Sequence, residues 1–276
     1  MISGLYTAAS GMLLGLRQQD VVADNMANSS TIGYKAEQSS QIAFGNVLAR
    51  SVGGAKGPLS LSSDRIIGSF GTGAYVNRTR TFLAQGSDRL TGAPLDAMVR
   101  GDGFFAVQMP DGVRYTRDGH FSRNDVNTLV NTKGHPVLDT NGQPITVDTD
   151  RVRIKSDGGL YRLVPTTVTN ADGTQGSQDR EEFVARLQIV TIDAGDLVRG
   201  GDTQFMARAG ATVTPAVFTE DGNTTVLQGA LEEANVAVNE TATDMFSLSR
   251  TFEASQKVFA TISESLQAAV KEVGKV

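Results

Sequence analysis

Apolar residues recur at alternating spacings of four and three near both ends of the chain. The first repeat runs through Leu5, Ala9, Met12, Leu16, Gln19, Ala23 and Met26. The second repeat runs through Val238, Ala242, Met245, Ser249, Phe252, Gln256, Phe259, Ser263, Leu266, Val270 and Val273, and it is widened by Leu248, Ile262 and Ala269. This period is typical of helices that pack lengthwise on another helix. We therefore predict an N-terminal helix and a second helix from about 231 to 273, roughly 60 Å long at 1.5 Å per residue.

The N-terminal helix is expected to stop in the polar stretch after its apolar repeat. Ser29, Ser30 and Thr31 offer hydroxyl groups that compete with helical hydrogen bonds. Gly33 adopts a positive φ at low cost, so it is a candidate stop signal. The sequence thus predicts a helix and junction over 1–35, followed over 36–63 by a linker with a short helix and a glycine-rich loop.

The middle of the chain, from about 64 to 225, has a different pattern. Runs such as "LDAMVR" and "GFFAVQM" alternate apolar and polar residues, which is typical of half-buried strands. Asp-Gly and Asn-Gly pairs separate the runs, and such pairs suit hairpin turns. The polar stretch "VTNADGTQGSQDREE" is predicted to be a long exposed loop. The expected fold class is therefore α+β: a β-rich central domain over 64–225, the N-terminal helix, and a C-terminal helical region over 226–276.

Composition removes several classes of function. The 276 residues include 25 basic and 30 acidic side chains, for a formal charge of -5, which argues against a nucleic-acid partner. The absence of cysteine excludes disulfides and thiolate metal sites. No apolar run approaches the roughly 20 residues that cross a membrane. The N-terminus lacks a basic region before its apolar residues, so no cleaved signal peptide is expected.

Candidate catalytic and ligand motifs are weak. The segment "GDGFFA" at 101–106 fits a loose nucleotide fingerprint, but a hairpin pattern follows it where that motif needs a helix. His120 and His135 have no metal-ligand partner at a useful spacing. The Asp-Gly pairs are too irregular for calcium-binding repeats. We expect no enzyme activity, no cofactor, no metal site and no small-molecule substrate.

The two apolar stripes leave two packing arrangements open. Small and polar members of the stripes would make a thin seam: Ala9, Gln19, Ser249, Gln256 and Ser263. Burying each larger side chain fully would contribute roughly 1.5 to 3 kcal/mol. The two helices can pack on each other as an antiparallel pair within one chain, or neighbouring copies can supply the surface that a single narrow seam leaves unsupported.

Six segments resemble the flagellar hook and basal-body rod family, in the order "YTAASGM", "NMANSSTIGYK", "GTGAYV", "RGDGFFAV", "RYTRDGHF" and the long C-terminal segment that starts "LQGALEEANVAVNE". The family's Asn-Leu-Ala-Asn and Thr-x-Gly-Tyr/Phe-Lys patterns match Asn25, Met26, Ala27, Asn28, Thr31, Gly33, Tyr34 and Lys35, with Met26 for the usual Leu. Its C-terminal pattern matches Asn235, Val236, Glu240, Arg250, Phe252 and Glu253, with Ala234 and Ala237 replacing the usual Ser and Asn.

The resemblance implies a structural subunit of the basal-body rod. Terminal helices would pair in a coiled-coil-like layer that forms the inner wall of a helical, torque-carrying tube. The implied partners are copies of the chain, other rod and hook subunits, and the flagellar type III export apparatus. The implied location is the basal body crossing the cell envelope, reached without a cleaved signal peptide. The length favours a rod subunit over a hook-type subunit.

The same resemblance assigns subunit contacts to both helices and their junctions. The expected contact residues are Leu5, Ala9, Met12, Leu16, Ala23, Asn25, Met26, Asn28, Gly33, Tyr34, Asn235, Val238, Met245, Arg250, Phe252, Phe259, Ile262 and Leu266. Two alternatives stay open at this point. One is a hook-type subunit, and the other is a secreted β-rich binding module or adhesin whose helices close its own fold.

Overall fold

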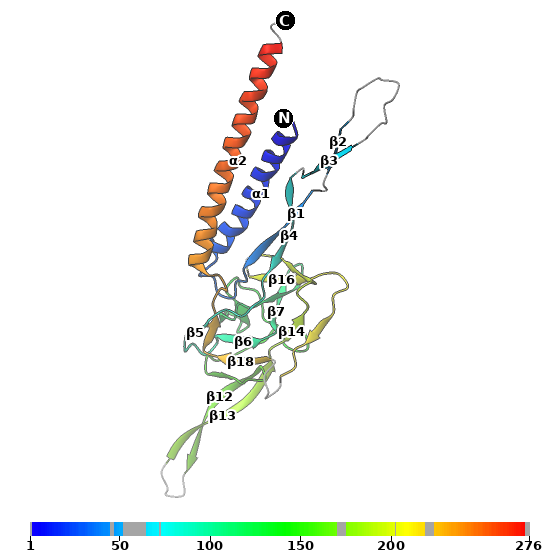
Figure 1. The fold of residues 1–276 in the computed structure, drawn as a ribbon. Helices are drawn as coiled ribbons and strands as arrows, with labels where there is room; N and C mark the ends of the chain where they lie inside the picture. Colours follow the sequence, from blue (N-terminus) through cyan, green and yellow to red (C-terminus); the bar gives the residue numbers. More distant parts are fainter. Residues whose placement is uncertain are drawn as a thin grey trace. The chain divides into compact units, whose positions relative to one another are not determined.

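The protein is described from a computed structural model (Figure 1), which covers residues 2–44, 47–51, 65–71, 73–169, 175–201, 203–218 and 224–273. The chain forms two compact units. Unit 1 comprises Met1–Met26, Glu37–Arg80 and Val238–Val276, and unit 2 comprises Ala27–Ala36 and Thr81–Ala237. Each unit is therefore assembled from segments that lie far apart in the sequence.

Unit 1 combines two long helices with two-stranded ribbons. Helix α1 spans Ile2–Ala27 and helix α2 spans Val238–Val273. Strand β1 (Glu37–Ala43) pairs with β4 (Ala74–Thr81), and β2 (Val47–Ser51) pairs antiparallel with β3 (Arg65–Phe70). Figure 1 shows α1 and α2 side by side with both chain termini at the same end, so the two helices are antiparallel.

Three glycines of α1 face side chains of α2. A Cβ atom placed on Gly4 would lie 3.3 Å from Ile262, one on Gly11 would lie 3.6 Å from Ser255, and one on Gly15 would lie 3.8 Å from Phe252. Further along, the Gln19 side chain donates a hydrogen bond of 2.8 Å to the Ser249 hydroxyl. The face of α1 toward α2 thus includes glycines that the apolar repeat did not contain, and glycine lets a facing side chain approach the helix backbone.

Unit 2 is built from short strands. Its largest sheet has six strands in the order β15-β16-β8-β7-β14-β17. A three-stranded sheet has the order β11-β12-β13, and the pairs β9–β10, β6–β18 and β5–β19 complete the unit. The bounds are β5 Asp88–Leu90, β6 Ala97–Gly101, β7 Phe104–Met109, β8 Gly112–Thr116, β9 Phe121–Arg123, β10 Leu129–Asn131, β11 Val152–Ile154, β12 Gly159–Thr169, β13 Gln175–Arg186, β14 Ile189–Ile192, β15 Leu197–Arg199, β16 Gln204–Ala207, β17 Val213–Pro215, β18 Thr224–Gln228 and β19 Ala230–Glu232.

The strands of unit 2 enclose an apolar core. Phe105 and Phe121 meet edge to face, with ring centroids 5.1 Å apart, and both are almost completely buried. The core is so close-packed that a Cβ atom on Gly119 would lie 1.6 Å from the Ala97 carbonyl oxygen. The structure therefore confirms an α+β chain with a β-rich body and a helix at each end.

Three predicted elements differ from the structure. The C-terminal helix begins at Val238 instead of near 231, because 230–232 form β19 against β5 and side-chain bonds from Asn235 hold the next segment extended. The short helix predicted within 36–63 is wrong, since β1 and β2 lie there; the glycine-rich part at 52–64 lies outside the described residues.

The third difference is the polar stretch at 168–182. Much of it is strand, because β12 and β13 pair in register as far as Thr169 and Gln175. Opposite charges on the sheet make this polar sequence compatible with pairing: Arg162 bonds to Glu182 at 2.6 Å and Arg153 to Glu181 at 2.6 Å. A loop prediction from polarity alone missed these ion pairs between strands.

Candidate functional site

The segments that adjoin the two helices meet in the interior of unit 2. We call this meeting point the junction clasp, and it consists of Gly33, Tyr34, Lys35, Arg117, Arg199, Glu232 and Asn235. Residues 33–35 come from the junction after α1, Glu232 ends β19, and Asn235 lies just before α2. The clasp therefore draws on parts of the chain almost 200 residues apart, such as Lys35 and Glu232 with a separation of 197.

A buried ion pair lies at the centre of the clasp. The Lys35 ammonium and the Glu232 carboxylate are 2.6 Å apart, and their side chains are 0% and 1% exposed. Lys35 also donates to the Ala84 carbonyl at 2.8 Å, and the Gly86 amide donates to the same Glu232 oxygen at 2.8 Å. Burial lowers the pKa of Lys35, and the charge of Glu232 opposes that change. Both charges are removed from water, so each stabilises the other, and either one would be costly to bury alone.

Arg117 brings a second cation to the same carboxylate. Its guanidinium lies 3.3 Å from the other Glu232 oxygen, donates to the Gly101 carbonyl at 2.8 Å, and lies 4.9 Å from the centre of the Phe104 ring. Burial lowers the pKa of Arg117, while Glu232 and then Asp102 oppose the change. One carboxylate thus joins Arg117, which directly follows β8, to the junction after α1.

Gly33 is required by geometry. It has φ of 67°, and a Cβ atom there would lie 2.4 Å from the Asp118 amide nitrogen. Its own amide donates to the Glu232 carbonyl at 2.8 Å. The prediction that Gly33 stops the first helix is wrong, because α1 ends at Ala27 and the turn begins at Asn28. Gly33 instead lets the junction enter the wall of unit 2.

Tyr34 is completely buried beneath Arg199. The Arg199 guanidinium lies 4.5 Å from the centre of the Tyr34 ring and donates to the Tyr34 hydroxyl at 3.2 Å. It also donates to the Lys35 carbonyl at 2.5 Å. This stacking and bonding fixes both the side chain and the backbone of the junction.

Two asparagines bridge backbone segments. The Asn235 carbonyl oxygen accepts from the Ala36 amide at 2.7 Å, and its amide donates to Phe82 at 2.7 Å and Ala84 at 2.8 Å. In unit 1, Asn25 donates to the Glu37 carbonyl at 2.7 Å and accepts from the Glu37 amide at 2.8 Å. Each asparagine side chain thus both donates to and accepts from backbone groups of another segment, as a strand partner would.

The other predicted contact residues lie on the two helices. Leu5, Ala9, Met12, Ala23, Met245, Phe252, Phe259, Ile262 and Leu266 are partly buried. Leu16, Met26 and Val238 are 42%, 42% and 46% exposed, and Arg250 is exposed as well. Asn28 is partly buried at the start of the turn, where its side chain accepts a bond from the Thr31 hydroxyl.

Sequence reasoning did not assign roles to four clasp residues: Lys35, Arg117, Arg199 and Glu232. Lys35, Arg117 and Glu232 lay inside segments that carried the resemblance, which was the available signal. Arg199 lay outside them, and nothing in its neighbourhood pointed to Tyr34. Pairing between distant charges is not visible in a single sequence.

The clasp is suited to mechanical linkage. Most of its polar groups bond to each other or to backbone atoms, and the buried Nε atoms of Arg117 and Arg199 are exceptions. Among the described residues no group of three or more His, Cys, Asp or Glu side chains is placed to hold a metal ion. None of the described helices has the length and apolar character needed to cross a membrane.

Known families match three segments of the chain. Residues 5–35 match the family described as "Flagella basal body rod protein", residues 98–161 match "Flagellar hook protein FlgE/F/G D1 domain", and residues 227–272 match "Flagellar basal body rod FlgEFG protein C-terminal". The three charges of the central cluster come one from each segment: Lys35, Arg117 and Glu232. The clasp thus joins all three family segments.

Similar proteins extend over the full chain. The flagellar hook-basal body complex protein FlhO of Bacillus subtilis (strain 168) is 32% identical over 100% of both chains. The flagellar basal-body rod protein FlgF of Salmonella typhimurium is 31% identical over 96% of both, and FlgG of Bacillus subtilis is 30% identical over 97% of both. These relatives favour a rod subunit over a secreted binding module. The chain belongs to the flagellar basal-body rod and hook protein family, and it is a structural subunit of the rod.

Proposed function

We propose that this subunit builds the rod through α1 and α2, which pack against neighbouring copies and against other rod and hook subunits to form the wall of a tube. The observation that carries the proposal is the exposure of large apolar side chains on both helices. Tyr6, Leu13, Phe246 and Val270 are 69%, 65%, 72% and 70% exposed. Apolar surface of this kind gathered on one part of a protein marks an interaction site.

The clasp fixes the segments that adjoin both helices. The segment after α1 and the segment before α2 are both held inside unit 2 by Lys35, Glu232 and Asn235. In the proposed function, both segments that lead to the helices are therefore anchored in the same β body. A buried ion pair with further backbone bonds resists shear better than a solvated contact, because separating its charges exposes each to a low-dielectric interior.

We also propose that the flagellar type III export apparatus carries the chain to the basal body without removing a signal peptide. The proposal is supported by membership of the flagellar rod and hook family and by apolar side chains in the first turns of α1, such as Leu5 and Tyr6, which the proposed assembly would bury. Mass spectrometry of the protein from purified basal bodies tests this. A chain that lacks these first turns would contradict it.

The experiment that tests assembly compares the same Leu→Asp change on a helix and on the β body. Leu16→Asp places a carboxylate on α1, where the side chain is 42% exposed in the single chain. We expect a folded protein that is lost from basal bodies and does not restore motility, because assembly would bury the charge at a cost of several kcal/mol. Phe252→Asp on α2 is expected to have the same effect.

Leu90→Asp is the matched control, because Leu90 is 79% exposed on β5 of unit 2. Both variants should show the thermal unfolding of the unmodified β body. Incorporation of Leu16→Asp into basal bodies at the level of Leu90→Asp would refute assembly through the helices.

A further inference from the structure

An Asn-Gly pair, which occurs once in the sequence, lies in an exposed turn of unit 2. Asn141 and Gly142 are both exposed, and the turn connects Leu138 to Pro144, which form an antiparallel bridge. Gly142 has φ of 73°, and a Cβ atom placed on it would meet nothing within 4 Å. No other part of the described chain therefore covers this position of the turn.

The pair has a specific chemical reactivity. The backbone nitrogen of Gly142 attacks the side-chain carbonyl carbon of Asn141 and forms a cyclic imide. The bond from that carbon to the side-chain nitrogen breaks, and ammonia leaves with the proton of the Gly142 amide. Water then opens the imide to aspartate or to isoaspartate. Glycine favours the attack because it has no side chain beside the attacking nitrogen.

One residue holds both reacting groups in the folded protein. The Asp139 Oδ1 atom accepts from the backbone amides of Asn141 at 2.9 Å and Gln143 at 2.8 Å. The Oδ2 atom accepts from the side-chain amide of Asn141 at 3.1 Å. The Asp139 carbonyl accepts from the Gly142 amide at 2.9 Å. The attacking nitrogen and the leaving group are thus both bonded to Asp139.

These bonds oppose the reaction. The Gly142 nitrogen must lose its proton to attack, and this proton is bonded to the Asp139 carbonyl. The carboxylate beside it disfavours a second negative charge on the nitrogen. The bond to Oδ2 also fixes the Asn141 side chain. We infer that Asn141 is a site of spontaneous deamidation, and that Asp139 keeps the reaction slow as long as the turn is closed.

The modification would weaken the turn in which it occurs. A carboxylate at position 141 replaces a donor to Asp139 with a like charge, and isoaspartate also lengthens the backbone. Asp139 forms a bridge with Leu187, whose side chain is 0% exposed in the core of unit 2. Position 141 therefore records how long the turn of each chain has been open, whether or not the chain is assembled.

Peptide mapping by mass spectrometry tests the site on the full-length protein. Each sample is incubated at mildly alkaline pH, either in native buffer or in guanidinium chloride, and the modified fraction at position 141 is followed over time. In native buffer Asp139→Ala should lose the Asn141 amide about tenfold faster than the unmodified chain, because each lost hydrogen bond shifts the closed turn several-fold toward the open one. In guanidinium chloride the two rates should be equal, because the turn is open in both proteins.

Asp125→Ala is the matched control, because Asp125 is exposed in another turn of unit 2. It should deamidate at the rate of the unmodified chain. Asn127 is an internal control, since Thr128 follows it in place of glycine. Asp139→Asn keeps an acceptor oxygen and removes the charge, so its rate should lie between those of the unmodified chain and Asp139→Ala. It also replaces Asp139→Ala if thermal unfolding shows that the alanine variant is not folded.

Three results would overturn the assignment. A native rate in the unmodified chain equal to its rate in guanidinium chloride would show that the turn gives no protection. Native rates of the folded Asp139 variants equal to that of Asp125→Ala would remove the role of Asp139. Conversion of Asn127 in guanidinium chloride without conversion of Asn141 would remove the site itself.

Discussion

Units 1 and 2 solve the problem of burying apolar surface differently. Unit 2 has a core of fully buried large side chains: Phe105 and Leu160 are 0% exposed and Phe121 is 3% exposed. In unit 1 the two helices meet through glycines, and Phe246 of α2 is 72% exposed. Side chains that pack in a core stabilise a fold on their own, whereas exposed apolar side chains gain that stabilisation only from a neighbour.

Polar groups show the same contrast. Unit 2 contains the buried cluster of Lys35, Glu232 and Arg117, which is tolerated because each charge has a partner. In unit 1 the hydrogen bond from Gln19 to Ser249 links the helices in a partly buried position. From this difference we predict that unit 2 has a fixed native arrangement before assembly, and that the helix pair gains much of its stability in the rod.

The largest expected difference between the units is in hydrogen exchange of the free monomer. Amides in Leu5–Met26 and Met245–Leu266 should exchange at least about a thousand times faster than those of Phe105 and Ile189, because core strands open with nearly the global free energy and a thin helix pair does not. Exchange mass spectrometry on a verified monomer measures this. Equal protection in both units would show that the helices form a self-sufficient pair.

The buried charge cluster should be the most sensitive polar feature of unit 2. Glu232→Ala leaves Lys35 and Arg117 buried without their carboxylate, and we expect a loss of about 3–5 kcal/mol in the free energy of unfolding. Chemical denaturation monitored by the near-ultraviolet signal of the β body measures the effect. Glu233→Ala is the control, since Glu233 is exposed. A change no larger than that of Glu233→Ala would mean that the charge cluster is not closed in solution.

The next prediction makes the same Gly→Ala change once in each unit, with opposite expected effects on stability. Gly119→Ala places a Cβ atom 1.6 Å from the Ala97 oxygen, so unit 2 should lose about 1–3 kcal/mol or more by overpacking. Gly11→Ala places it 3.6 Å from Ser255, an ordinary contact, so α1 should gain up to about 1 kcal/mol in helix propensity.

Thermal unfolding and far-ultraviolet circular dichroism of the two glycine variants separate these effects. Gly119→Ala should lower the melting temperature of the β body, and Gly11→Ala should raise the helix content of the monomer. Loss of helix content in Gly11→Ala would show that the added methyl group clashes with α2. The helices would then lie closer together at this point than the 3.6 Å contact with Ser255 indicates.

The sequence predicted the parts of this fold that depend on local pattern. Alternation located β6 and β7, and the spacing of four and three located both helices. The start of α2 was missed because Asn235 bonds to backbone groups at Phe82 and Ala84, more than 150 residues away. The β12–β13 hairpin was missed for a similar reason, since ion pairs such as Arg162 with Glu182 form only after the strands meet.

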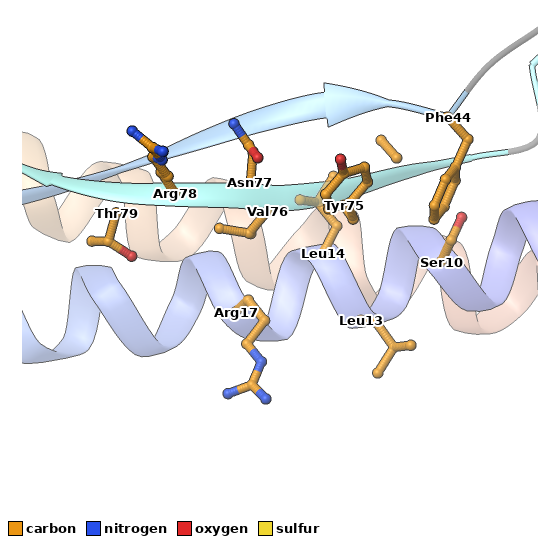
Figure 2. Close-up of a pocket in the computed structure, with 11 residues that line it drawn as sticks. Ser10, Leu13, Leu14, Arg17, Phe44, Tyr75, Val76, Asn77, Arg78 and Thr79 are labelled. Atoms are coloured by element: carbon orange, nitrogen blue, oxygen red, sulfur yellow. The ribbon is translucent and has the colours of Figure 1, made fainter.

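The candidate site was only partly accessible from sequence. The resemblance pointed to Gly33, Tyr34 and Asn235, but their environment in unit 2 depends on Arg117, Arg199 and Glu232, which tertiary folding brings together. The groove between α1 and β4 of unit 1 (Figure 2), which side chains of both elements line, was not predicted, because it is made by the return of β4 from a distant part of the chain. Local pattern thus predicts elements, whereas contacts between distant side chains determine how the elements join.

The smallest expected effect concerns a single buried carboxyl in unit 2. Burial raises the pKa of Asp118, and bonds from the His120 amide and the Thr132 hydroxyl oppose that change; the charges of His120 and Asp96 act in opposite directions. The folded protein therefore holds this proton more tightly than the unfolded chain. The resulting stability is fully present below the unfolded pKa of about 3.9 and is lost as the pH rises through the folded pKa.

Asp118→Asn should remove this pH dependence while keeping the side chain's shape and its bond from the His120 amide. Urea unfolding across the acidic range should show wild type most favoured relative to the variant at the lowest pH, with the difference shrinking as the pH rises. Asp125→Asn, at an exposed position, controls for the loss of one carboxylate. A difference that grows with pH would mean that hydrogen bonds to the charged Asp118 carboxylate outweigh the effect of its burial.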